Sequence, residues 1–363
     1  MLDFIISFVL TLLVLFMVIN LGGLLLWVER KGSAVLQDRI GANRAAIFGK
    51  LPFNFGLINT LVADPLKLIT KEDFIPPGAD RVLHTLAPII ALLPILITFL
   101  VIPFGDVLVI GERTITLQAA SLNVGLLYVL AMVSLGVYGV VLGGWASNNR
   151  WALLGGIRGS AQMISYEIAM GLSLIGVVLS FGTLDLQVIS RAQGQLWGGV
   201  IPAWGIFLQP VAFFIFLTAG IAESKRNPFD LPEAESELIS GYFTEYSGMK
   251  QATFMLVDFV EVVVVAALVT TLFFGGWQVP FLVREGFQFP GGLSIGLPSL
   301  LVSLLQVGAF TLKVIFFCWL QIMIRWTLPR FRYDQLISLG WKILLPLALV
   351  NVMATALVIL LVE

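Results

Sequence analysis

Eight long apolar runs are the feature of this sequence that most constrains its fold. A transmembrane helix needs about 20 mostly apolar residues, because it rises about 1.5 Å per residue and crosses a hydrocarbon core about 30 Å thick. Runs of that kind cover roughly residues 4–27, 83–104, 119–144, 160–181, 201–222, 252–274, 297–324 and 340–361. The sequence therefore predicts an all-α, polytopic integral membrane protein, with eight transmembrane helices in a single bundle over residues 1–363.

The overall composition excludes several other classes of protein. Of the 363 residues, 58% are hydrophobic and only 12% are charged, whereas about 25% of the residues of a soluble domain are charged. So few charges cannot cover a soluble surface, which excludes an ordinary soluble enzyme and a disordered protein. The formal net charge of −1 gives no field that attracts a polyanion, so no nucleic acid is expected as a partner.

The counts of cysteine and histidine limit the redox chemistry. Cys318 and His84 are single representatives of their residue types, and neither a Cys₄ iron–sulfur cluster nor a His-rich zinc or haem site can be built from them. The sequence also contains no dinucleotide fingerprint and no Walker loop. We therefore expect this chain to bind no metal and no cofactor, neither NADH nor ATP, and any redox cofactor to lie on another subunit.

Basic residues give the bundle a predicted orientation. Of the 21 Lys and Arg residues, 17 lie in the odd-numbered loops, which follow runs one, three, five and seven. The opposite loops hold Arg113, Arg191 and Arg284, and Lys313 lies within the seventh run. Because cytoplasmic loops carry the excess of Lys and Arg in membrane proteins, we expect these odd-numbered loops in the cytoplasm. Both termini would then lie outside, for a multi-pass protein of the cell (inner) membrane.

The first cytoplasmic loop, residues 28–82, is too long for a simple connector. Some of its apolar residues recur near every fourth position, namely Leu57, Ile58, Leu61, Val62, Leu66 and Ile69. This spacing predicts a short amphipathic helix that lies on the membrane surface. Such a helix is either a plain surface anchor or one wall of a site that admits a lipid-like molecule from the bilayer.

The third cytoplasmic loop, residues 223–251, is acidic where the other cytoplasmic loops are basic. It contains three basic residues and six acidic ones, and the acids are Glu223, Asp230, Glu233, Glu235, Glu237 and Glu245. Carboxylates this close repel one another, and burial would let some of them hold a proton near neutral pH. The loop is therefore either a solvated acidic segment or an element that handles protons and couples their movement to another reaction.

Four charged residues lie well inside the apolar runs, away from their ends. Glu167 is in the fourth run, Asp258 and Glu261 share one face of the sixth at i, i+3, and Lys313 is in the middle of the seventh. Charges at membrane depth cost several kcal/mol unless they are paired or hydrated, and they commonly mark ion or proton routes. The structural alternative is simple pairing, for example of Lys313 with a carboxylate.

The acidic loop carries the strongest resemblance to a known family, in the string AESKRNPFDLPEAESEL at residues 222–238. Further matching segments are Glu29-Arg30-Lys31, residues 37–44, Asp64 with Lys67, Lys71-Glu72-Asp73, Ser165-Tyr166-Glu167 and residues 327–336. Together they resemble, over essentially the whole chain, the membrane subunit of NADH:quinone oxidoreductase, respiratory complex I, that is called subunit 1 in mitochondria. Two departures occur in the sixth run: Asp258-Phe259 stands where the family usually has Glu-Tyr, and Glu261 where Asn is commoner.

The resemblance implies eight transmembrane helices at the place where the membrane arm meets the hydrophilic arm. It implies as partners the iron–sulfur and quinone-site subunits of the hydrophilic arm, small neighbouring membrane subunits, quinone and lipid, with FMN and iron–sulfur clusters on partner subunits. It implies a quinone chamber and entry at Arg30, Arg39, Arg44, Asp64, Lys67 and Phe229. It implies proton coupling through Glu223, Asp230, Glu233, Glu235, Glu237, Glu167, Asp258, Glu261 and Lys313.

The sequence thus predicts a quinone-chamber and proton-coupling subunit of a translocase, with no catalysis by the isolated chain. One alternative is the homologous subunit of an ion-pumping membrane-bound hydrogenase or ferredoxin-oxidising complex, against which the long acidic string argues. A second is a stand-alone ion transporter, which does not need such motif-dense cytoplasmic loops. A third is a structural anchor, which does not need carboxylates inside its helices.

Overall fold

Helices account for most of the fold. The computed structural model describes residues 2–41, 62–110, 113–197, 201–290 and 294–362. The longer helices are α1 (Leu2–Leu36), α4 (Arg81–Thr98), α5 (Gly125–Ala146), α6 (Arg150–Phe181), α9 (Pro210–Glu223), α11 (Gly248–Phe273), α12 (Ser299–Thr327) and α14 (Leu345–Val362). The short ones are α3 (Asp64–Thr70), α7 (Leu186–Ala192), α8 (Gly205–Leu208), α10 (Glu235–Leu238) and α13 (Tyr333–Ser338).

Within these described ranges, seven helical segments are long and apolar enough to cross a membrane. They match predicted runs one to four and six to eight, and the last joins α13 to α14 through a π-helical turn at Leu339–Leu344. The prediction of an all-α polytopic membrane protein is confirmed. The predicted fifth run, 201–222, is divided between β4 (Ile201–Pro202), α8 and α9. The 14 residues of α9 extend about 21 Å at 1.5 Å per residue, less than the thickness of a hydrocarbon core.

Helix ends differ from the predicted runs because hydrogen bonding, not hydropathy, decides them. The side chain of Asn149 accepts a hydrogen bond from the backbone N–H of Trp151 and so caps the start of α6. This helix begins at Arg150, well ahead of the predicted run 160–181. Helix α1 extends past the end of its predicted run, 4–27, to Leu36, so the first part of the predicted first loop is helical. The long helices therefore carry polar residues beyond their apolar spans.

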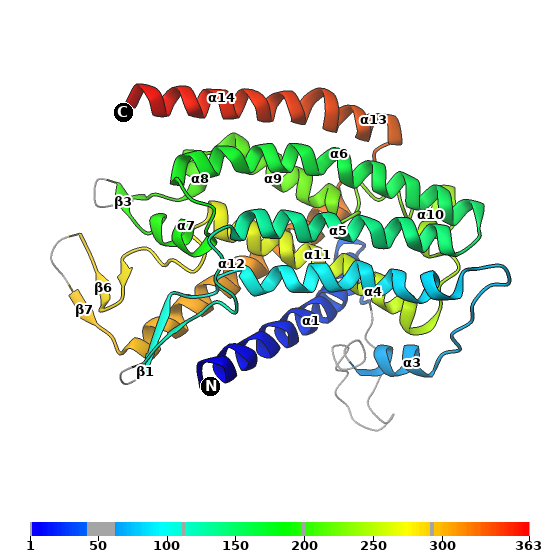
Figure 1. Ribbon diagram of the computed structural model, residues 1–363, viewed down its shortest axis with the longest axis horizontal. Coiled ribbons are helices and arrows are strands. Elements are labelled where there is room, and N and C mark those ends of the chain that lie inside the picture. The colour runs from blue at the N-terminus through cyan, green and yellow to red at the C-terminus, as the bar shows by residue number, and fades with distance from the viewer. Residues whose placement is uncertain (1, 42–61, 111–112, 198–200, 291–293, 363) are drawn as a thin grey trace.

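The central helix of the bundle is α11. In its most apolar stretch 78% of the residues are buried, against 22% for α1 and 17% for the segment of α13 and α14. Every residue from Val257 to Phe273 is buried, and α1, α4, α9 and α12 pack against this helix. Figure 1 shows α11 in the middle of the bundle, with α1 and α14 at opposite edges. Asp258 and Glu261 therefore lie on the helix that has the least access to lipid.

Short antiparallel strands gather at one end of the bundle. They are β1 (Val107–Ile110) with β2 (Arg113–Thr116), β3 (Leu196–Trp197) with β4, and the sheet of β5 (Leu282–Val283), β6 (Gly286–Gln288) and β7 (Ser294–Gly296). Figure 1 shows these strands at the same end as the start of α1 and the end of α14, whereas α3, α10 and α13 lie at the other end.

The predicted amphipathic helix is described in part. Leu57, Ile58 and Leu61 lie outside the described residues. The described portion is α3, in which no residue is buried and the side chains of Leu66 and Ile69 are exposed. An exposed apolar surface of this kind is what a helix needs to lie on a membrane.

Gly139 lies where α5 packs closely against α4. A Cβ added to Gly139 would lie 2.6 Å from the backbone nitrogen of Ala91. We predict that Gly139→Ala lowers the free energy of unfolding by about 1–3 kcal/mol, because the two helices must move apart. The matched control is Gly171→Ala in α6, where a Cβ would meet nothing within 4 Å. Thermal denaturation of the purified protein in detergent measures both, and equal midpoints would contradict the prediction.

Candidate functional site

A buried lysine, Lys225, lies at the centre of the site, at the end of the bundle that carries the basic, odd-numbered loops. The chain leaves α9 at Ser224 and turns at Lys225, whose φ is +53°. The Lys225 Nζ then donates hydrogen bonds of 2.9 and 2.8 Å to the two carboxylate oxygens of Glu261 and lies 3.5 Å from Oδ1 of Asp258. The Lys225 side chain is fully buried. The i, i+3 spacing of the two acids puts both carboxylates on the face of α11 that meets this turn.

Burial alone would lower the pKa of Lys225, but the carboxylates of Glu261 and Asp258 outweigh it and raise that pKa above its ordinary value. The ammonium is therefore a permanent charge at neutral pH rather than a carrier of protons. Breaking such a pair inside a protein leaves an uncompensated buried charge, which is strongly destabilising. Lys225 thus fixes the acidic loop to the central helix.

Beside this pair, the carboxylate of Glu29 accepts hydrogen bonds from two arginines. Its Oε2 lies 2.6 Å from Nη1 of Arg226 and its Oε1 lies 2.8 Å from Nη1 of Arg325. The guanidinium carbon of Arg226 also lies 3.8 Å from the ring centre of Phe259, a cation–π contact. These contacts join α1, the loop after α9, α11 and α12 at one point.

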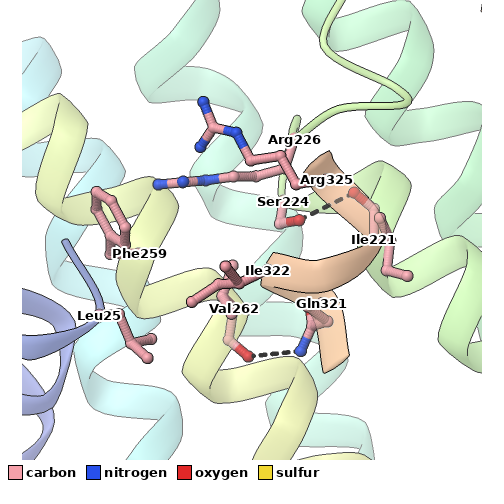
Figure 2. Close-up of a pocket in the computed structure, with 9 residues that line it drawn as sticks. All are labelled: Leu25, Ile221, Ser224, Arg226, Phe259, Val262, Gln321, Ile322 and Arg325. Carbon is pink, nitrogen blue, oxygen red and sulfur yellow. Dashed lines mark hydrogen bonds between the residues drawn. The ribbon is translucent and has the colours of Figure 1, made fainter. Parts of the chain in front are cut away.

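Beneath the two arginines is a small cavity (Figure 2). Its volume is about 10 Å³ and it is lined by Leu25, Ile221, Ser224, Arg226, Phe259, Val262, Gln321, Ile322 and Arg325. This is room for about one water molecule. Figure 2 shows the hydrogen bond from Gln321 Nε2 to the carbonyl of Val262, which closes one wall. None of the residues predicted for the quinone chamber lines this cavity.

The outer carboxyl groups of the site lie close enough to share protons. The Glu233 carboxyl is hydrogen-bonded to that of Asp258. Burial raises the pKa of Glu233 well above its ordinary value, and the neighbouring charges of Asp258 and Asp230 add to this effect. Burial also raises the pKa of Asp230 to about 6, although Arg330 pairs with it at 2.8 Å and opposes the shift. Burial therefore favours the protonated form of both loop carboxyls, and Asp230 changes protonation near pH 6.

The inner carboxyl groups continue this series into the bundle. Glu223, at the end of α9, is buried, and neither carboxylate oxygen has a hydrogen-bond partner within the described part of the chain. It interacts electrostatically with Glu261 on one side and with Glu167 on the other. Glu167 in turn accepts a hydrogen bond from Ser134 Oγ of α5. Electrostatic interactions between neighbours link these carboxyls into a row, which consists of Asp230, Glu233, Asp258, Glu261, Glu223 and Glu167.

Several predicted site residues lie apart from this row. Glu237 is half exposed and pairs with Arg158 at 2.7 Å. Arg30 pairs with Asp64 at 2.7 Å, Arg39 donates to Gln37, and Lys67 is exposed. Phe229 is buried and stacks on Phe331 with ring centres 5.3 Å apart, so its ring belongs to the core. Arg44 and the side chain of Glu235 lie outside what the structure describes.

Lys313 lies at the opposite end of α11 and not with the carboxyl row. Its Nζ donates hydrogen bonds to the carbonyl oxygens of Phe274, Gly276 and Gln278, at 2.8, 3.0 and 2.7 Å. It also lies 5.0 Å from the ring centre of Trp204. The suggested pairing of Lys313 with a carboxylate is wrong for the described residues. A cation at the carbonyl end of a helix interacts favourably with the helix dipole instead.

Sequence reasoning missed the residues that hold the carboxyl row in place, Lys225, Arg226, Glu29 and Arg325. The bases Lys225, Arg226 and Arg325 entered the sequence analysis only through the loop charges that predict the orientation of the bundle. One signal was available: Lys225-Arg226 is a basic pair inside the acidic loop, separated from Glu223 only by Ser224. Which acid each base meets depends on long-range contacts, such as that between Glu29 and Arg226, which spacing along the chain does not reveal.

The fold and site define a class of protein, a polytopic membrane protein with a row of buried carboxyls at one end of its bundle. The family model described as NADH dehydrogenase matches residues 8–356. The NADH-quinone oxidoreductase H subunit 2 of Geobacter sulfurreducens is 48% identical over 343 residues, covering 94% of this chain and 93% of that protein. The H subunit 1 of Cytophaga hutchinsonii is 45% identical over 335 residues, covering 92% of this chain and 91% of that protein. This chain belongs to the NADH dehydrogenase family, with these H subunits as relatives.

Removing the lysine at the centre of the site tests its structural role. We predict that Lys225→Met lowers the free energy of unfolding by about 3–5 kcal/mol, because Glu261 and Asp258 stay buried without a cation. The double variant Lys225→Met/Glu261→Gln should recover part of this loss. The control is Arg332→Met, which removes the exposed pair with Asp334 and should leave the thermal midpoint unchanged. A midpoint equally unaffected in Lys225→Met would show that the ion pair is dispensable.

Proposed function

We propose that this chain is the membrane subunit that links quinone reduction to proton movement in a proton-pumping NADH:quinone oxidoreductase. The observation that carries the proposal is the row of six carboxyl groups that leads from the acidic loop into the bundle. The two relatives above are named as H subunits of NADH-quinone oxidoreductases, which supports the quinone reaction over the hydrogenase alternative. A row of buried acids also argues against a purely structural anchor.

The coupling works through electrostatics. Reduction of a quinone to a quinol takes up two electrons and two protons. Negative charge on the reduced headgroup raises the proton affinity of carboxylates near it. Asp230 and Glu233, with the neighbouring Glu235 and Glu237, are the loop groups that respond, because burial already brings the pKa of the first two toward neutrality. Protons then pass along Asp258, Glu261, Glu223 and Glu167.

Within the row, the cations set the resting state. Lys225 pairs directly with Glu261, whereas Glu223 has no hydrogen-bond partner among the described residues and receives the unfavourable charge of both Glu261 and Glu167. A proton on Glu223 relieves that repulsion. Glu223 is thus the group at which a proton arriving from the loop is held before it moves toward Glu167. Lys313, at the far end of α11, supports this helix and is outside the row.

The quinone chamber and its entry lie, in this proposal, between the end of α1 and α3. The ion pair of Arg30 with Asp64 connects these two elements. The exposed Leu66 and Ile69 give α3 an apolar surface for the bilayer, from which quinone enters. Arg39, Arg44 and Lys67 complete the expected entry and chamber, shared with neighbouring subunits of the complex, whereas the predicted Phe229 packs in the core.

The redox cofactors, FMN and iron–sulfur clusters, belong to partner subunits in this proposal, and the chain itself holds none. Its one cysteine, Cys318, and its one histidine, His84, are both buried. His84 stacks on Tyr246 with ring centres 4.0 Å apart, a packing contact. The partners are the other subunits of the complex: the iron–sulfur and quinone-site subunits of the hydrophilic arm and the small membrane subunits beside this one.

Neutral replacement of a loop carboxyl tests the coupling. We predict that Glu233→Gln lowers NADH-to-quinone activity of the assembled complex at least about tenfold, because an amide accepts no proton for transfer. NADH-to-ferricyanide activity, which needs only the flavin module, should be unchanged. Glu223→Gln, Glu235→Gln and Glu237→Gln test the neighbouring positions.

The matched control for these variants is Asp334→Asn, an exposed carboxylate that pairs with Arg332 at the same end of the bundle. It should retain both activities. Full quinone activity and full proton pumping in Glu233→Gln and Glu223→Gln would contradict the proposal, whereas loss of ferricyanide activity as well would point to failed assembly.

The orientation can be measured because the natural cysteine is buried. In this proposal the odd-numbered loops face the cytoplasm, both termini lie outside, and α9 serves as the fifth of eight crossings despite its length. A membrane-impermeant maleimide should label Asp334→Cys in inverted vesicles and Arg113→Cys in right-side-out vesicles, since both positions are exposed. The unsubstituted chain, with Cys318 fully buried, is the control. Labelling of both positions from one side would contradict an odd number of crossings between them.

A further inference from the structure

At the end of the bundle away from the carboxyl row, one buried acid gathers two arginines. Oδ1 of Asp106 accepts a hydrogen bond from Arg191 Nε at 2.8 Å and lies 2.7 Å from Arg191 Nη2. Oδ2 of the same carboxylate accepts a hydrogen bond from Arg284 Nε at 2.8 Å. The backbone N–H of Asp106 also donates to Gln306 of α12. This residue joins α7, the β5–β6 turn and α12 at a single point.

The pairing with Asp106 leaves guanidinium donors unused. Arg191 uses Nε and Nη2, and Arg284 uses Nε, so Nη1 of Arg191 and both terminal nitrogens of Arg284 have no acceptor among the described residues. The Arg284 side chain is 70% exposed. Two guanidinium groups on one carboxylate leave a surplus positive charge. Guanidinium groups with free terminal nitrogens favour carboxylate and phosphate ligands.

These donors face an open cavity of about 500 Å³, a volume within the range of small-molecule sites. Its lining includes Asp106, Arg191, Trp277, Leu282, Arg284 and Glu285. Trp277 is only 3% exposed and its indole nitrogen is buried away from the open space, so this residue contributes an apolar part of the cavity wall.

The charges around the cavity have both signs. Arg191 and Arg284 are positive and Asp106 and Glu285 are negative, so the lining is formally neutral. Asp106 is buried and satisfied by the arginines, whereas Glu285 is exposed and its carboxylate is unpaired among the described residues. The groups that remain free to bind a ligand are thus the terminal guanidinium nitrogens of Arg284 and, at the next residue, the carboxylate of Glu285. A ligand that carries an anionic and a cationic group fits this arrangement better than a simple anion.

We propose that this cavity binds the headgroup of a zwitterionic phospholipid that has a primary ammonium group. Arg284 and Arg191 hold the phosphate and Glu285 accepts hydrogen bonds from the ammonium. Leu282 and Trp277 give the apolar wall on which the glycerol and the first acyl carbons lie. The site is separate from the carboxyl row and does not depend on the function proposed for it.

The position of the cavity favours a lipid as the source of the phosphate. Figure 1 shows the strands β6 and β7 beyond the ends of the long helices, at the end of the bundle where α1 begins and α14 ends. α11 ends at Phe273 and α12 begins at Ser299, so the lining residues 277–288 lie just outside two apolar spans. This is the depth of lipid headgroups, where indole rings are also enriched.

Lipid retention by the purified complex tests the proposal. The complex is stripped with detergent, incubated with dioleoyl-phosphatidylethanolamine, -phosphatidylcholine or -phosphatidylglycerol, washed, and its lipid measured by mass spectrometry. We expect phosphatidylethanolamine to be retained in preference to the other two, and Arg284→Gln to weaken that retention about tenfold, the effect of one charge-assisted pair. Glu285→Gln should remove the preference for phosphatidylethanolamine over phosphatidylcholine.

Arg113→Gln is the matched control, because it removes a positive charge from the same side of the protein outside the cavity lining. It should retain lipid as the unsubstituted complex does, and Arg284→Lys should retain more than Arg284→Gln. Equal loss in Arg113→Gln and Arg284→Gln would overturn the proposal, as would equal retention of all three lipids. Displacement of the lipid by millimolar inorganic phosphate would assign the cavity to a free anion instead. If Arg284→Gln fails to assemble, the exposed Glu285→Gln still decides between these outcomes.

Discussion

The contact between Lys225 and the two acids of α11 is the interaction on which the rest of the structure depends. A charge inside an apolar bundle is tolerated only with a partner, and Lys225 supplies one for Glu261 and Asp258 at 2.8 and 3.5 Å. Since the lysine is carried by the loop after α9, neutralising the central helix also pulls the acidic loop into the protein. Asp230 and Glu233 are buried as a consequence, and that burial raises their pKa values.

The central helix is held by two lysines that have different tasks. Lys225 meets acidic side chains in the middle of α11. Lys313 of α12 meets three backbone carbonyls beyond the end of α11 rather than acidic side chains. This division keeps α11 fixed while the charge state of the carboxyl row changes along it. At the two ends of the bundle, Glu29 and Asp106 are each paired with two arginines. Each of these acids thereby connects several elements.

The two departures from the usual family sequence in α11 find physical explanations in these contacts. Glu261 stands where Asn is commoner. Both of its carboxylate oxygens accept hydrogen bonds from Lys225, so the extra negative charge is balanced by a positive one. Asp258 is short, yet its carboxyl reaches that of Glu233. Phe259 lacks a phenol hydroxyl, and its ring instead receives the guanidinium of Arg226 at 3.8 Å. Each altered side chain has a partner from the loop after α9.

By itself the sequence determined the membrane class, seven of the spans and the family, because hydropathy and the acidic string are local properties of the chain. It also singled out the acids of the row, since a carboxylate in an apolar run is conspicuous wherever it lies. Only the tertiary structure decided that α9 is short, that Glu237 pairs at the surface with Arg158, and that Lys313 caps a helix. It alone brought Glu29 to Arg226 and Asp106 to Arg284, because pairing between distant residues depends on how the helices pack and not on their spacing.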